Sequence, residues 1–360
     1  MSLTLSKPLY PCEPIRNLHA LASALRVPGE ELAELAKLAN KSYSKVPPKP
    51  GKKPRECFNA KPRLKAVHKK IKEAIFHRVE FPMYLTGSIK GRDYILNADL
   101  HKNKAVLICE DVKKFFPSVR AERVKDVWIN VFGFSEDVAL LLTQLTTKDG
   151  GLPQGAITSS YLANLVFWRD EPLLEAKLAA RGIDYSRYVD DIAMSSKRRL
   201  PNSVYTKSIS DVYGMLRRNG LLADREDKHK FFRSSQQMRL TNLIVNRKPS
   251  LPISKRRNAR AAVFQIQQRV ANGELTQEVS QLLTKASHLV GGIGRLHKEE
   301  GEQLKQRLKQ VKDSLAIQGG IPFITESNSL NEMPTTNLSS ANPPWEWKSE
   351  INSPQAGHEY

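Results

Sequence analysis

Two adjacent aspartates, Asp190 and Asp191, lie at the centre of residues 185–195, where apolar and polar residues alternate on both sides. This alternation predicts two short strands joined by a tight turn, in which aspartate is a common turn residue. Neighbouring carboxylates at such a turn repel each other and lose hydration unless a cation lies between them. The expected cation is Mg²⁺, which takes one or two carboxylates together with substrate phosphates. Taken alone, however, an Asp-Asp pair is ordinarily a solvated turn.

A third carboxylate follows an apolar run further upstream. Residues 105–109 (Ala-Val-Leu-Ile-Cys) predict a buried strand, and Asp111 lies where this strand ends. If the strand pairs with the 185–195 hairpin, Asp111 converges with Asp190 and Asp191. Three carboxylates could then hold two Mg²⁺ ions about 3.5–4 Å apart, the arrangement used for in-line phosphoryl transfer.

Three segments resemble the motifs of reverse transcriptases in their order and spacing. They are 111–119 (Asp-Val-Lys-Lys-Phe-Phe-Pro-Ser-Val), 151–159 (Gly-Leu-Pro-Gln-Gly-Ala-Ile-Thr-Ser) and 188–191 (Tyr-Val-Asp-Asp). A fourth segment, 97–101 (Asn-Ala-Asp-Leu-His), resembles the Asn-Ala-x-x-His signature of bacterial retron reverse transcriptases. The resemblance covers residues 15–310 or so and makes the three aspartates the catalytic, magnesium-binding residues.

The fold implied by this resemblance is an α+β, right-hand polymerase with fingers, a palm of antiparallel sheet and helices, and a helical thumb. The expected parts are an N-terminal helical region (1–44), fingers (45–104), a palm with interleaved fingers elements (105–235), a thumb and RNA-binding region (236–318) and an acidic tail (319–360). We expect the tail to be largely disordered, because its apolar content is too low to offset the ordering entropy.

The resemblance also implies a nucleotide site. Phe116, five residues after Asp111, would lie under the sugar, where its ring excludes a 2′-hydroxyl; ordinary core packing is the alternative role. Gln154 would contact the nucleotide from a glycine-flanked loop, because glycine lets backbone approach closely. A single helix is expected after this loop, from Thr158 to about Ala179. Lys90, Arg92 and Lys104 are the candidates to hold the triphosphate, since cations stabilise the charge of transferring phosphoryl groups.

Two other residues near these motifs have competing roles. Lys228 lies where relatives carry a lysine that protonates the departing pyrophosphate; Lys230 is the alternative, and either could be a solvated surface lysine. His101 could in principle ligate a metal. A lone histidine without partners at ligand spacing is more often a structural hydrogen-bonding residue, which is our expectation.

RNA recognition is expected in the segment after the palm. Residues 239–246 alternate as a strand, in the region where retron enzymes carry a Val-Thr-Gly triplet that helps read the RNA primer. Here the triplet is Leu-Thr-Asn, so only Thr241 is kept and Asn242 replaces the glycine. Lys255, Arg256 and Arg257 open a long basic helix that suits the phosphate backbone of a primer–template duplex.

The overall charge agrees with a polyanionic partner. The 360 residues include 57 Lys+Arg against 37 Asp+Glu, a net charge of +20. Nucleic acid is a better partner than an anionic membrane surface, because no apolar run approaches the roughly 20 residues needed to span a bilayer and the N-terminus lacks a signal peptide. The three cysteines are widely separated and predict neither disulfides nor a zinc site, which fits the cytoplasm.

We therefore expect an RNA-directed DNA polymerase that copies a structured noncoding RNA into DNA from dNTPs, using two Mg²⁺ ions. The retron resemblance further implies antiviral defence together with an effector protein. One alternative is an abortive-infection or other defence-associated reverse transcriptase with protein-primed or non-templated synthesis. Another is a catalytically idle RNA-binding scaffold, although a scaffold has no reason to keep three converging carboxylates.

Overall fold

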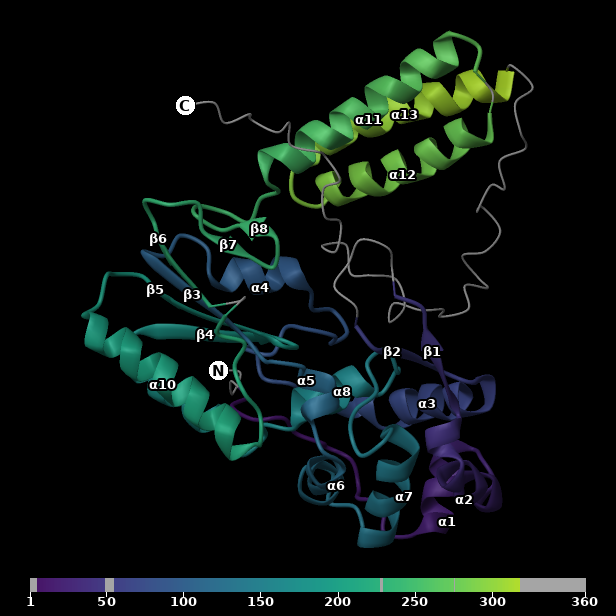
Figure 1. Ribbon diagram of the computed structural model, residues 1–360, viewed down its shortest axis with the longest axis vertical. Coiled ribbons are helices and arrows are strands. Elements are labelled where there is room, and N and C mark those ends of the chain that lie inside the picture. The colour runs from purple at the N-terminus through teal and green to yellow at the C-terminus, as the bar shows by residue number, and fades with distance from the viewer. Residues whose placement is uncertain (1–4, 49–54, 227–228, 275, 318–360) are drawn as a thin grey trace, which may run out of the picture. The chain divides into compact units, whose positions relative to one another are not determined.

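The computed structural model in Figure 1 describes residues 5–48, 55–226, 229–274 and 276–317. These residues form two compact units that divide between Pro249 and Ser250. The expected acidic tail, 319–360, lies outside the described residues. None of the described helices is long and apolar enough to cross a membrane.

A four-stranded antiparallel sheet forms the centre of the first unit, with the strand order β4-β5-β3-β6. The strands are β3 (Val106–Asp111), β4 (Ile183–Tyr188), β5 (Asp191–Ser196) and β6 (Lys230–Arg233). The predicted buried strand before Asp111 and the predicted 185–195 hairpin are therefore both confirmed. Their pairing in one sheet follows from the apolar runs on each strand, which are buried together.

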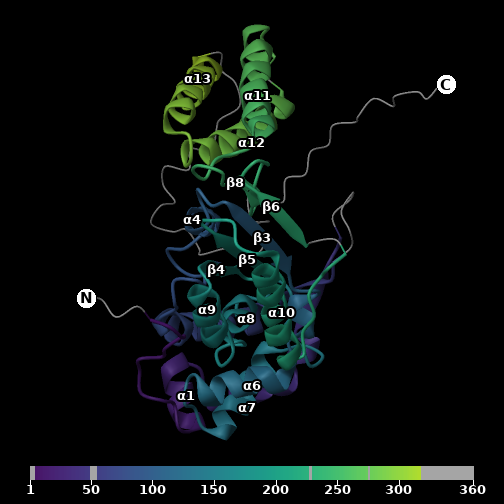
Figure 2. The ribbon, with the colours of Figure 1, turned by 90° about the vertical axis from the view of Figure 1, so that its left-hand side faces the viewer.

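Helices cover both faces of this sheet (Figure 2). Helices α9 (Glu171–Ala180) and α10 (Asn202–Arg218) lie on one face, where the Tyr205 hydroxyl hydrogen-bonds to Ser196. Helix α4 (Tyr94–Leu100) lies on the other face. It begins at Asp93, whose carboxylate accepts hydrogen bonds from two backbone N–H groups of the first turn and thereby caps the helix.

The remaining elements of the first unit surround this core. They are α1 (Leu18–Leu25), α2 (Gly29–Lys37), α3 (Pro62–Ala74), α5 (Phe115–Ser118), α6 (Ala121–Asn130), α7 (Glu136–Thr146), α8 (Ser159–Leu165) and the strand pairs β1–β2 (Tyr43–Val46, Cys57–Ala60) and β7–β8 (Arg239–Leu240, Leu243–Ile244). Short 3₁₀ turns occupy Ala39–Lys41 and Phe76–Arg78.

Two predicted elements were wrong in detail. A single helix was expected from 158 to about 179, but the chain forms α8 and α9, separated by a turn. Pro172 in the first turn of α9 explains the break, because proline lacks the N–H that a continuous helix requires. The expected strand 239–246 is instead the tight β7–β8 hairpin, because Thr241 and Asn242 both have positive φ angles (45° and 62°) and reverse the chain.

The second unit is a helical bundle with its own core. Helices α11 (Ile253–Ala271), α12 (Gln277–Gly294) and α13 (Lys298–Ile317) bury one shared apolar cluster that is separate from the core of the first unit. Residues 236–249, the start of the predicted thumb and RNA-binding region, cluster with the first unit.

His101 lies just after α4 and is fully buried against the sheet. Its Nδ1 and Nε2 atoms are each 2.7 Å from a serine hydroxyl, those of Ser195 and Ser186 respectively. The expected structural role of His101 is confirmed. Burial lowers the pKa of this histidine from about 6.5 to about 4, with the nearby Asp184 opposing the shift and Lys104 adding to it.

This buried histidine predicts a loss of stability in mild acid. The unfolded chain binds a proton near pH 6.5 and the folded chain only near pH 4, so protonation favours unfolding. The contribution of His101 to stability is constant above about pH 6.5 and falls below it, by on the order of 2 kcal/mol at about pH 5. Urea unfolding at about pH 7.5 and about pH 5 should show a difference of at least this size, because burial lowers the pKa of His68 to about 4 as well. The difference should shrink by about 2 kcal/mol in His101→Gln. The exposed His19 provides a control, since His19→Gln should keep the parental pH dependence.

Candidate active site

The three predicted carboxylates meet at one end of the central sheet. The register of β3 on β5 pairs Asp111 directly with Asp191, so both side chains leave the same face of the sheet. The backbone N–H of Val112 donates to the carbonyl of Asp190 at 3.1 Å, which joins the hairpin turn to the end of β3. Asp111 is almost buried, whereas Asp190 and Asp191 are partly exposed. The expected convergence of these two segments is therefore confirmed.

Hard carboxylate oxygens on neighbouring strands fit Mg²⁺, which completes its octahedron with water and substrate phosphates. Among the described residues, no three His, Cys, Asp or Glu side chains already close around a metal ion. A metal site that takes some of its ligands from the substrate does not need three protein ligands already in place. The donor chemistry thus fits Mg²⁺, with Asp111 and Asp191 as the pair opposite each other.

The turn that carries Asp190 is strained. Val189 has a φ of 60°, a left-handed conformation that β-branched residues adopt rarely. Gly87 lies against this turn so closely that a Cβ at position 87 would be 2.6 Å from Val189 Cγ2 and 2.7 Å from its backbone nitrogen. The carbonyl of Gly87 is itself fixed by the amide of Asn164, which donates to it at 2.7 Å. The turn is therefore held by close backbone packing.

A buried polar network connects α4 to the β4–β5 hairpin. The Asn97 side-chain oxygen accepts hydrogen bonds from Thr86 (2.9 Å) and Ser186 (2.7 Å), and Ser186 also contacts His101. The Asn-Ala-x-x-His segment is therefore a packing element of the sheet in this chain. Burial raises the pKa of Tyr188, which precedes the turn, and the nearby Asp93 and Asp191 raise it further.

The loop 151–156 lies beside Phe116. The N–H of Leu152 donates to the Phe116 carbonyl at 3.2 Å, and Phe116 packs at the margin of the core with its ring partly exposed. On the other side of the loop, the Gln154 carbonyl accepts from the N–H of Phe58 in β2 at 2.8 Å. A Cβ at Gly155 would be 2.7 Å from the Phe58 carbonyl, so only glycine fits there. Phe116 and Gln154 thus belong to one connected loop region.

The predicted cations of the nucleotide site differ in their surroundings. The guanidinium of Arg92 donates to the carbonyls of Phe81 (2.6 Å), Leu85 (2.7 Å) and Pro82, so it braces its own loop. Its contact with a triphosphate stays a prediction. Lys104 pairs with Asp184 at 2.7 Å. Lys90 is exposed, and Lys228 lies outside the described residues. Lys230 is exposed on β6 opposite Cys109, on the same face of the sheet as Asp111.

Sequence reasoning missed the buried charges behind the hairpin. Arg187 and Glu171 form an ion pair of 2.6 Å on the α9 side of the sheet, and Glu110 accepts a hydrogen bond from Tyr213 at 2.9 Å. The only signal for the first pair was an arginine at a position of β4 whose alternation predicts an inward side chain. Nothing in the sequence pointed to Glu171 as its partner.

Comparison with known families decides the assignment. The sequence profile of the family described as reverse transcriptase (RNA-dependent DNA polymerase) matches residues 47–245, more than half of the chain. The chain belongs to the reverse transcriptase family. Retron Se72 reverse transcriptase of Salmonella heidelberg is 34% identical to it over 313 residues, covering 85% of this chain and 82% of that protein. Retron Ec48 reverse transcriptase of Escherichia coli is 27% identical over 316 residues, covering 83% and 77%. This is therefore a retron-type reverse transcriptase.

The RNA-binding residues expected in this reverse transcriptase fall in both units. In the first unit, Thr241 and Asn242 form the β7–β8 turn, and the Thr241 hydroxyl donates to the Tyr94 carbonyl of α4 at 3.3 Å. In the second unit, Arg257 is exposed and Lys255 is partly buried. Both residues lie on α11, in the predicted basic segment 255–257.

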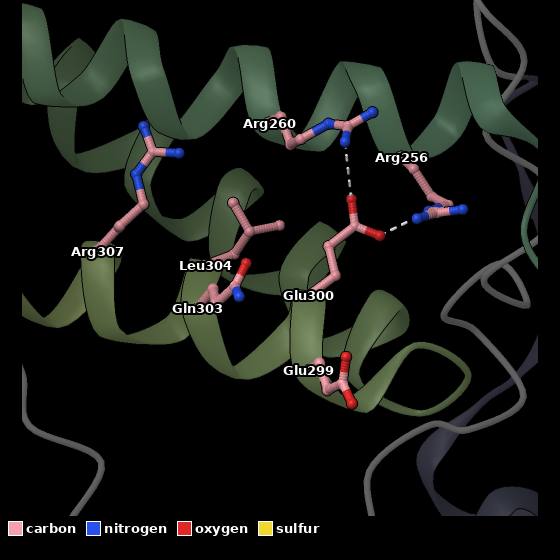
Figure 3. Close-up of a pocket in the computed structure, with 7 residues that line it drawn as sticks. All are labelled: Arg256, Arg260, Glu299, Glu300, Gln303, Leu304 and Arg307. Atoms are coloured by element: carbon pink, nitrogen blue, oxygen red, sulfur yellow. Dashed lines mark hydrogen bonds and ion pairs between the residues drawn. The ribbon is translucent and has the colours of Figure 1, made fainter.

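Arg256 takes a different role from the one expected. Its Nε donates to Glu300 of α13 at 2.6 Å, and Arg260 approaches the other oxygen of the same carboxylate at 3.4 Å (Figure 3). These side chains line a cavity of about 320 Å³ between α11 and α13, together with Glu299, Gln303, Leu304 and Arg307. Arg256 thus joins two helices of this reverse transcriptase, and its contact with phosphate stays a prediction.

The close approach at Gly87 gives a direct test of the turn. Gly87→Ala places a methyl group within the Val189 backbone contact, so the turn must shift, at a cost of about 1–3 kcal/mol. Thermal unfolding should show this loss, and primer extension should slow at least about tenfold as the carboxylates move. Gly291→Ala, in a helix with nothing within 4 Å of the new Cβ, should retain both stability and activity. Parental activity in Gly87→Ala would show that the turn tolerates displacement.

Proposed function

We propose that this reverse transcriptase copies a structured noncoding RNA into DNA by two-metal nucleotidyl transfer. The observation that carries this proposal is the register that puts Asp111 opposite Asp191, with Asp190 in the adjoining turn. These three residues would hold the Mg²⁺ ions. Bound Mg²⁺ would supply charge stabilisation to the transferring phosphoryl group and lower the pKa of the attacking hydroxyl.

The right-hand architecture is part of the same proposal. We assign the central sheet with α9 and α10 to the palm (105–235), the β1–β2 hairpin and α3 to the fingers (45–104), and α11–α13 to the thumb. The N-terminal helices α1 and α2 form the separate region 1–44. A thumb with a core of its own supports this assignment, because such a unit can be stable while it contacts a duplex.

Nucleotide selection would rest on the loop region around Phe116. We propose that the partly exposed ring of Phe116 excludes the 2′-hydroxyl, that Gln154 contacts the incoming dNTP, and that Lys90 approaches the triphosphate. In the transfer step, a terminal hydroxyl attacks the α-phosphate and pyrophosphate leaves. The proton that pyrophosphate takes up would come from Lys228 or Lys230; the sheet register places Lys230 on the face that carries Asp111.

RNA recognition would combine shape with charge. Thr241 and Asn242 would read the primer RNA from the β7–β8 turn, while Lys255 and Arg257 contact phosphates without regard to sequence. The net charge of +20 supports the phosphate contacts. The retron reverse transcriptases among its relatives support a place for this enzyme in a retron system. We propose that this system acts in antiviral defence with an effector protein. Asn242 in place of glycine favours, as the second candidate, another defence-associated reverse transcriptase with different priming.

The metal site is tested by Asp190→Asn. Removing one carboxylate charge takes away stabilisation of several kcal/mol, so incorporation of dNTPs should fall by roughly 10³-fold or more. Binding to the RNA that copurifies with the protein should stay within about threefold, because phosphate contacts elsewhere supply the affinity. Asp137→Asn removes an exposed acid on α7 and should change neither property. A fully active Asp190→Asn enzyme would refute the assignment.

The sugar gate is tested by Phe116→Ala. The smaller side chain leaves room for a 2′-hydroxyl, so the rNTP/dNTP ratio of kcat/KM should rise by roughly tenfold or more. Phe116→Tyr keeps the bulk of the ring and should keep the parental ratio. If the ratio is unchanged in a folded Phe116→Ala protein, Phe116 belongs only to the core.

A further inference from the structure

Arg187 is among the largest fully buried side chains of the described residues. Its guanidinium forms a two-point pair with Glu171 of α9, in which Nε lies 2.6 Å from Oε1 and Nη2 lies 2.8 Å from Oε2. Glu171 is only 2% exposed, and the guanidinium also stacks over the Phe167 ring at 4.9 Å. Burial alone lowers the pKa of Arg187, but the Glu171 carboxylate outweighs it and the net shift is upward. The arginine is therefore firmly cationic.

The rest of the guanidinium is directed at the backbone near the catalytic turn. Nη1 donates to the carbonyl of Val189 at 3.0 Å, and Nη2 donates to the carbonyl of Asn164 at 3.0 Å. Asn164 in turn holds Gly87, which lies against Val189. One side chain thus connects α8 and α9 to the residue immediately before Asp190.

Stability alone does not account for such a pair. Two buried charges lose their hydration, and replacing a buried pair by apolar residues of similar volume is often neutral or even stabilising. An apolar pair would fill the same space but could not hold a carbonyl. The hydrogen bond to the Val189 carbonyl stabilises the turn, because the left-handed φ of 60° is disfavoured for valine.

We propose that Arg187, oriented by Glu171, is a positioning residue for the metal site. It fixes the Val189 carbonyl, and thereby the directions in which Asp190 and Asp191 leave the turn. This inference rests on the proposed function, in which those aspartates hold Mg²⁺. Loss of the guanidinium should leave the fold intact and weaken metal binding.

The test uses the full chain carrying Arg187→Met together with Glu171→Leu. Manganese binding to the protein in complex with a chain-terminated primer–template and dNTP is followed by electron paramagnetic resonance, with Mn²⁺ as the probe for the Mg²⁺ site, and thermal unfolding is measured in parallel. We expect the double variant to fold, with a lower melting temperature because the Val189 and Asn164 carbonyls lose their donor and the Tyr185 hydroxyl loses its acceptor, and to bind Mn²⁺ roughly tenfold more weakly. In primer extension on a homopolymer RNA, the Mg²⁺ concentration for half-maximal rate should rise by a similar factor, with the KM for dNTP at saturating Mg²⁺ unchanged.

A matched control removes a different ion pair of the same helical layer. Arg181 and Asp211 lie 2.7 Å apart and join the end of α9 to α10. Arg181→Met with Asp211→Leu should therefore leave Mn²⁺ affinity at the parental value. Equal weakening in this control would overturn the proposal, because the effect would then follow from any change in the helices.

Two outcomes separate the parts of the proposal. A double variant that folds and binds Mn²⁺ like the parent refutes the positioning role of Arg187. If the double variant does not fold, Glu171→Gln, which keeps the shape of the side chain, should weaken Mn²⁺ binding by about threefold; a folded Glu171→Gln protein with parental affinity refutes the role equally. Failure of the proposed function is distinct, because the parent itself would then bind no Mn²⁺ dependent on Asp190.

Discussion

The antiparallel register between β3 and β5 is the constraint on which the proposed site depends. Side chains alternate across a strand, so a slip of one residue would send Asp111 to the face occupied by Glu110 and separate it from Asp191. Six residue pairs along these strands fix the register, and their apolar members are buried on both faces. The position of the carboxylates is therefore a property of the whole sheet.

The two faces of this sheet hold the catalytic hairpin by different means. On the α4 side, Asn97 and His101 form neutral hydrogen bonds with serine and threonine hydroxyls. On the α9 side, a buried ion pair reaches the turn backbone. These hydrogen bonds favour one arrangement of their members, because a shift would leave more buried groups unpaired. The hairpin tip is thus held from both faces of the sheet even though its aspartates reach solvent.

The sequence predicted the parts of the fold that short-range patterns encode. Alternation identified the hairpin, and the apolar run before Asp111 identified its partner strand. The structural role of His101 also followed from the lack of ligand spacing. Residues that act through distant partners were not predictable: Glu171 lies 16 positions before Arg187, and Arg256 turned out to bind Glu300 in another helix. Pro172 argues against a continuous 158–179 helix, because proline lacks the N–H that such a helix requires. The alternation in 239–246, by contrast, gave no sign of the turn.

The conformation of the β7–β8 turn bears on the replacement of glycine by Asn242 in the Val-Thr-Gly triplet. Both of its central residues are left-handed, and asparagine is the residue other than glycine that enters this conformation most readily. A Leu-Thr-Asn triplet can therefore keep the chain path that Val-Thr-Gly would follow, while adding an amide at the tip. The backbone conformation of the last two residues then describes this motif better than their amino-acid identity does. Searches for such enzymes by the literal triplet would overlook chains that preserve its shape.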